Sequence, residues 1–132
     1  MSESKRSPGI GTKAVWGAEE GVTWQGATQV PVVHSVTFGF DDLDEWLDVG
    51  SGKTRGHIYS RNTNPTVEVF EEKMRLLEGA EAATSFATGM AAISNLLFGL
   101  LAPGKRVVTI RDPYGGTSRI FLEFLPKFGV EV

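Results

Sequence analysis

Hydrophobic and polar positions change their spacing near the middle of the chain. Small and β-compatible residues fill 82–87, and apolar residues then recur at helical spacing over 91–101. This pattern predicts a strand that turns directly into an amphipathic helix, with Thr88 as its N-cap and Gly89 open to a close ligand. The free amides at such a corner bind anions, and phosphate is their usual ligand. From this stretch alone, the alternative that Gly89 only packs at the strand–helix corner and binds no ligand is about as well supported.

The second half of the chain alternates helical and strand patterns. Asn64 and Pro65 open a helix and Gly79 ends it. Two further strands are predicted at 106–110 and from residue 129 onward. The helix between them, at 118–128, is weakened near its end by Pro126. The expected inward-facing residues of these two helices are Val67, Phe70, Met74 and Leu77, and then Ile120, Phe121, Phe124 and Leu125.

This alternation predicts an α/β fold, with a parallel sheet and helices on its faces. Ligands of such sheets bind beyond the carboxyl ends of the strands, which here are followed by 88–90 and 112–117. Residues 1–26 have no sustained period and predict an extended arm. Residues 29–38 look β-like, and a short helix is expected at 41–48. We therefore predict an arm with a short helix over 1–60 and the first part of an α/β domain over 61–132.

Composition excludes several functional classes. The net charge of −3 provides no basic patch for nucleic acid, and the absence of cysteine excludes disulfides and thiolate metal sites. His34 and His57 have no partners at metal-binding or catalytic spacing. The N-terminus has no signal-peptide pattern, and the longest apolar run is too short for a membrane span. We expect a soluble cytoplasmic protein with no metal, nucleic-acid or membrane partner.

Three side chains are candidates for chemistry. Tyr59 and Arg61 combine a hydroxyl donor with a planar guanidinium, which suits a phosphate. Tyr114 follows a predicted strand and can stack on a planar ligand and transfer a proton. The alternatives are a surface arginine beside an interfacial tyrosine, and a tyrosine that fills the sheet edge.

Several short motifs resemble, in order and spacing, the cysteine/methionine metabolism family of pyridoxal-phosphate enzymes. That family includes cystathionine γ-synthase, cystathionine γ- and β-lyases, methionine γ-lyase and the homoserine sulfhydrylases. The resemblance implies pyridoxal 5′-phosphate as cofactor and fold type I, the aminotransferase-like PLP-dependent transferase fold. The chain would supply the N-terminal arm and the first part of its large parallel-sheet domain. The motifs are Tyr59-Ser60-Arg61, Asn64-Pro65-Thr66, Leu77-Glu78-Gly79-Ala80, Phe86-Ala87-Thr88-Gly89-Met90-Ala91-Ala92-Ile93 and Asp112-Pro113-Tyr114-Gly115-Gly116-Thr117.

The resemblance also implies roles for individual residues. Thr88, Gly89 and Met90 match the segment that holds the cofactor phosphate. Tyr59 and Arg61 match a pair that reaches the phosphate of a neighbouring subunit, which implies a dimer and, in this family, a homotetramer. Tyr114 matches the tyrosine that stacks on the pyridine ring and takes part in proton transfer at the amino-acid substrate.

Two features set limits on this resemblance. None of the lysines stands in the context of the lysine that carries the cofactor, so the chain resembles an N-terminal piece of a longer enzyme and should not turn over substrate alone. Gly116 occupies a position where methionine γ-lyases typically have cysteine. We therefore expect a cystathionine γ-synthase-like enzyme acting by γ-replacement or γ-elimination, with γ-lyases and O-acyl-homoserine sulfhydrylases as alternatives. A non-catalytic relic and another phosphate-ligand-binding α/β protein stay open outside the family.

Overall fold

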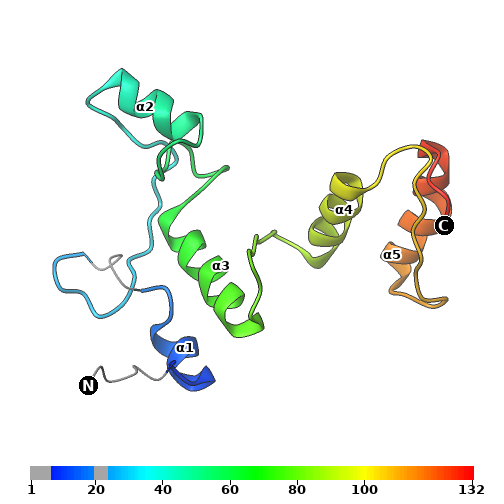
Figure 1. Ribbon diagram of the computed structural model, residues 1–132, viewed down its shortest axis with the longest axis horizontal. Coiled ribbons are helices and arrows are strands. Elements are labelled where there is room, and N and C mark those ends of the chain that lie inside the picture. The colour runs from blue at the N-terminus through cyan, green and yellow to red at the C-terminus, as the bar shows by residue number, and fades with distance from the viewer. Residues whose placement is uncertain (1–6, 20–23) are drawn as a thin grey trace, which may run out of the picture. The chain divides into compact units, whose positions relative to one another are not determined.

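A computed structural model of the protein describes residues 7–19 and 24–132, so part of the predicted arm lies outside the described residues. The chain divides into two compact units, Met1–Thr84 and Ser85–Val132, which are described separately. The first contains helices α1, α2 and α3, and the second contains α4 and α5 (Figure 1). No helix in the described part is long and apolar enough to cross a membrane.

Local capping signals determine where α2 and α3 begin and end. α2 spans Leu43–Gly50, and the carboxylate of Asp42 accepts a hydrogen bond from the backbone N–H of Asp44 at 2.9 Å. α3 spans Pro65–Glu78, with Asn64 as N-cap and Gly79 in the left-handed region (φ 66°) as its end. The predicted Asn64–Pro65 start and Gly79 stop are therefore confirmed, and the short helix predicted at 41–48 is present with its bounds shifted by two residues.

The expectation of an arm without regular structure is wrong over its first described part. Ile10–Trp16 forms a short helix, α1, which packs against α3. Lys73 of α3 donates to the carbonyl of Val15 at 3.1 Å and pairs with the carboxylate of Glu19. Because this helix lacks an apolar period of its own and gains its partners from α3, the pattern along the chain could not reveal it.

In the second unit, α4 spans Gly89–Leu100 and Thr88 caps it, as predicted. α5 spans Gly115–Arg119, earlier than expected, and continues as a π-helical segment at Ile120–Phe124. A 3₁₀ turn at Leu125–Phe128 ends this helical stretch and contains Pro126. Proline offers no N–H for regular α-helical bonding, which accounts for the weakened last turn.

The core of the second unit is small. Phe121, Leu125 and Val130 are buried together, and Leu97, Leu101, Val107 and Ile120 pack against them. The predicted inward positions of Phe121 and Leu125 are confirmed. The inward position predicted for Phe124 is wrong, because this residue is 46% exposed. The change from α-helical to π-helical winding at Ile120 rotates later side chains away from a regular helical stripe.

Strand pairing is limited to isolated bridges in the part of the chain that the structure describes. Arg106 pairs in parallel with Glu131, and Thr37 pairs antiparallel with Tyr59. The strand expected at 82–87 is not formed, and those at 29–38, 106–110 and after 129 are reduced to these single bridges. The bridge at Arg106 has the predicted parallel direction, and the full parallel sheet stays a prediction.

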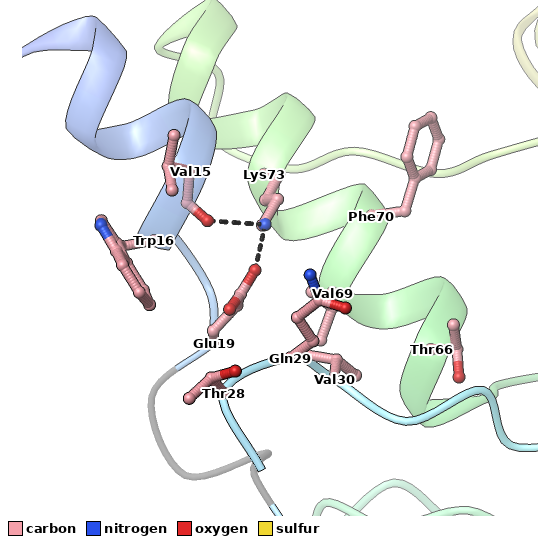
Figure 2. Close-up of a pocket in the computed structure, with 10 residues that line it drawn as sticks. All are labelled: Val15, Trp16, Glu19, Thr28, Gln29, Val30, Thr66, Val69, Phe70 and Lys73. Carbon is pink, nitrogen blue, oxygen red and sulfur yellow. Dashed lines mark hydrogen bonds and ion pairs between the residues drawn. The ribbon is translucent and has the colours of Figure 1, made fainter.

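The apolar stripe predicted for α3 is wrong as a description of what this structure buries. Val67, Phe70 and Met74 are at least 37% exposed and Leu77 is half-buried, whereas Val69 is the buried hydrophobic residue of this helix at 8%. Val69 lies on the side of α3 that meets α1 and residues 28–30 (Figure 2). The predicted helix is present, but the side of α3 that becomes covered depends on which segment packs against it.

We expect the isolated 132-residue chain to unfold over a wide range of urea concentration. Its buried hydrophobic side chains in the described part are Val69, Phe121, Leu125 and Val130, while many large apolar side chains are exposed. So small a core provides little cooperativity. Circular dichroism during a urea titration measures this, with a dye that binds exposed apolar surface as a second probe. A single steep transition seen by both probes would contradict the expectation.

Candidate functional site

The N-terminus of α4 presents free hydrogen-bond donors. The hydroxyl oxygen of Thr88 accepts from the backbone N–H of Ala91 at 3.0 Å, and the carbonyl of Thr88 accepts from Ala92 at 3.1 Å. Within residues 7–19 and 24–132, no group accepts the backbone N–H of Gly89 or of Met90. These two amides and the hydroxyl proton of Thr88 are therefore available to an anion at the positive end of the helix.

Gly89 leaves this helix end sterically open. A Cβ built on Gly89 would meet no atom within 4 Å, and Thr88 before it has an extended backbone (φ −149°, ψ 155°). The sharp change from extended to helical backbone directs the free amides outward from the end of α4. The predicted open corner at the start of α4 is therefore present, and anion binding at this corner stays a prediction.

Met90 and Tyr114 meet at Gly116. A Cβ built on Gly116 would lie 3.0 Å from Cε1 of Tyr114 and 3.1 Å from the sulfur of Met90. Tyr114 precedes the first residue of α5 and its side chain is 75% exposed. The structure therefore brings the predicted ring-stacking residue next to the predicted phosphate-binding helix end, within one unit.

Thr117 fixes this arrangement and was not singled out from the sequence. Its hydroxyl donates to the sulfur of Met90 at 3.7 Å, and the residue is 8% exposed. This contact ties the start of α5 to the start of α4. The available signal was a polar residue directly after paired glycines, and that signal is also common in ordinary loops.

Tyr59 and Arg61 form their own arrangement in the first unit. The guanidinium carbon of Arg61 lies 4.8 Å from the centre of the Tyr59 ring, a cation–π contact. Arg61 is exposed, and it makes no ion pair with any residue of the described ranges. Its charge and the Tyr59 hydroxyl are therefore free to bind a phosphate together.

A separate pocket of about 540 Å³ lies where α1, residues 28–30 and α3 meet (Figure 2). None of the predicted site residues lines it. Lys73 points between Val15 and Glu19. Its ammonium group donates to the carbonyl of Val15 and to the carboxylate of Glu19 (Figure 2). Lys73 thus joins α1 to α3.

Sequence comparison connects this geometry with known enzymes. Residues 11–132 match the family model "Cys/Met metabolism PLP-dependent enzyme". An L-methionine gamma-lyase of Pseudomonas putida is 35% identical over the whole chain, which covers 33% of that relative. An O-succinylhomoserine sulfhydrylase of Mycobacterium tuberculosis is 46% identical over 61% of the chain and 20% of the relative.

Solved structures agree with the sequence match. A Campylobacter jejuni protein described as an O-acetylhomoserine (thiol)-lyase is 30% identical to this chain, and the two structures superpose with a TM-score of 0.86. Its structure contains a pyridoxyl-lysine phosphate. That match covers 95% of this chain and 30% of the other. The metB structure from Corynebacterium glutamicum is 31% identical, with a TM-score of 0.82. This match covers 95% of this chain and 31% of the other. The chain thus spans about a third of the length of such relatives. It belongs to the Cys/Met metabolism family of PLP-dependent enzymes.

Proposed function

We propose that this chain provides the N-terminal third of a PLP-dependent enzyme of sulfur amino-acid metabolism. The observation that carries the proposal is the pair of free amides at Gly89 and Met90 beside the exposed Tyr114, in a chain whose family match runs over residues 11–132. Residues 1–60 would form the dimer-contacting arm, and 61–132 the first part of the cofactor-binding α/β domain with its parallel sheet.

The residues present fit pyridoxal 5′-phosphate. The amides of Gly89 and Met90 and the hydroxyl of Thr88 would bind the phosphate, since a doubly charged ester group needs several donors that have no other partner. Nothing within 4 Å of a Cβ built on Gly89 blocks the approach. The exposed ring of Tyr114 would lie against the pyridine ring.

The cofactor supplies the electron sink that this chemistry requires. Tyr114 would orient the pyridine ring, and its phenol oxygen would accept or donate the proton that is transferred at the substrate carbon. Tyr59 and Arg61 add a neutral and a charged donor to the phosphate bound by a neighbouring subunit. The active protein is then at least a dimer, and we propose a homotetramer acting on an amino-acid substrate.

Within this family we propose γ-replacement on an activated homoserine ester. Support comes from the 46% identity to an O-succinylhomoserine sulfhydrylase, together with Gly116 in place of the cysteine typical of methionine γ-lyases. The incoming nucleophile is the thiol of cysteine in a cystathionine γ-synthase-like reaction, and sulfide in a sulfhydrylase. Methionine γ-elimination is the second candidate, because a methionine gamma-lyase matches the whole chain.

One set of assays separates these reactions. The full-length protein, meaning this chain with the remainder of its reading frame, is incubated with O-acetyl- or O-succinyl-homoserine and either cysteine or sulfide. Cystathionine identifies the first form of γ-replacement and homocysteine the second. Release of 2-oxobutyrate from methionine alone would instead establish γ-elimination. A full-length protein without bound pyridoxal phosphate would contradict the whole proposal.

A further inference from the structure

We propose that Asn64 is a positioning residue for the cofactor phosphate, and that it acts by holding the Tyr59–Arg61 loop through Ser60. This inference rests on the proposed function, because it assigns Tyr59 and Arg61 to phosphate binding. Asn64 does not touch the predicted ligand itself. It is 7% exposed, and each of its side-chain polar atoms is engaged.

The two ends of the Asn64 amide perform different tasks. Its oxygen accepts from the backbone N–H of Thr66 at 2.9 Å, which caps α3. Its nitrogen donates to the carbonyl of Val33 at 3.0 Å and to the hydroxyl of Ser60 at 3.0 Å. The amide orientation is unambiguous, because the Thr66 N–H can only donate and the Val33 carbonyl can only accept.

Ser60 connects Asn64 to the predicted phosphate-binding pair. Its hydroxyl donates to the carbonyl of Ser35, and its backbone N–H donates to the carbonyl of Val36 at 2.8 Å. Ser60 stands between Tyr59 and Arg61 in the chain. The backbone pairing of Tyr59 with Thr37 holds one side of the loop, and Asn64 holds Ser60 from the other.

Helix capping alone would not need these contacts. Serine, aspartate and asparagine cap helices about equally well, since each offers an oxygen to the free amides. Only asparagine among them also donates two hydrogen bonds from the same buried position. The donating nitrogen of Asn64 is therefore the part that serves the loop, and the accepting oxygen is the part that serves α3.

Two variants separate the two tasks. Asn64→Ser and Asn64→Asp both keep a cap for α3, and both remove the donations to Val33 and Ser60. The first is smaller and neutral, and the second has the same size and carries a charge, so an effect that they share comes from the lost donations. Ser60→Ala removes the receiving hydroxyl with a milder change. Asp42→Asn is the matched control, because it makes the reverse substitution of Asn64→Asp at the N-cap of another helix, α2.

The measurement is the affinity of the full-length apoprotein for pyridoxal 5′-phosphate, followed by absorbance, together with the thermal unfolding midpoint of the same apoprotein. We expect the affinity to fall about tenfold in both Asn64 variants and in Ser60→Ala, measured at a temperature at which each variant apoprotein is still fully folded. Backbone hydrogen exchange at Ser60, Asn62 and Thr63 should also become faster. The Asp42→Asn control should change neither the affinity nor the exchange.

Specific outcomes would overturn the inference. An unchanged affinity in the Asn64 variants, or a loss seen only at temperatures at which the variant apoprotein is partly unfolded, would reduce Asn64 to a structural cap. Unchanged exchange at Ser60 would show that the loop does not depend on Asn64. A wild-type protein that binds no pyridoxal phosphate would contradict the proposed function instead, and the exchange measurement would still decide whether Asn64 positions the loop.

Discussion

Replacing Gly89 by proline is expected to weaken binding of pyridoxal 5′-phosphate to the full-length protein by about 10- to 100-fold, the value of one hydrogen bond to a charged group. Proline is well tolerated at the first residue of a helix, so α4 should still form. The extended backbone of Thr88 (φ −149°, ψ 155°) also suits a residue that precedes proline. The substitution therefore keeps the helix and replaces one free N–H by a ring methylene on the same nitrogen. Titration of the apoprotein with the cofactor measures the loss.

Gly89→Ala is the matched control for this substitution. It adds a Cβ that would meet no atom within 4 Å beyond its chain neighbours and the backbone of its own helix, and it keeps the N–H. The ratio between the affinities of the alanine and proline variants thus separates the effect of a Cβ from that of replacing the N–H by the proline ring. Equal affinities in the two variants would show that the Gly89 amide does not bind the phosphate, and the helix end would then be only a packing corner.

Features set by a few neighbouring residues could be predicted from the sequence. Asn64, Thr88 and Gly79 act on their own helix ends, and the structure places each of them as expected. α1 could not be predicted, because its contacts come from α3, far along the chain. The exposed side of α3 and the exposure of Phe124 have different causes: the packing segment decides which side of α3 is covered, and a local change of helical winding turns Phe124 outward.

In the candidate site, too, some features depend on neighbouring residues and others on contacts between distant segments. The free amides of Gly89 and Met90 follow from the local strand-to-helix pattern, and the cation–π pair of Tyr59 and Arg61 joins residues two positions apart. The approach of Met90 and Tyr114 to Gly116 joins segments more distant in sequence, and so does the contact of Asn64 with Val33. Only three-dimensional packing reveals such pairs, and these contacts orient the candidate residues within each unit.

Tyr114→Phe should reduce turnover by the full-length enzyme by about 100- to 10,000-fold, the usual contribution of a positioned general acid–base group. The phenyl ring can still stack on the pyridine ring, so the affinity for pyridoxal phosphate should change little. The free space around the exposed Tyr114 side chain, 75% accessible, makes the loss of one oxygen harmless to folding. Steady-state kinetics and cofactor titration of the same preparation measure the two quantities.

Tyr114→Ala separates the ring from the hydroxyl. It removes the stacking surface as well, so both turnover and cofactor affinity should fall, whereas the phenylalanine variant should lose turnover alone. A phenylalanine variant that retains full turnover would assign Tyr114 to stacking only and would require another group to move the proton. If both variants bound the cofactor as tightly as the wild type, the ring that stands over Gly116 beside Met90 would not be the surface on which the pyridine lies.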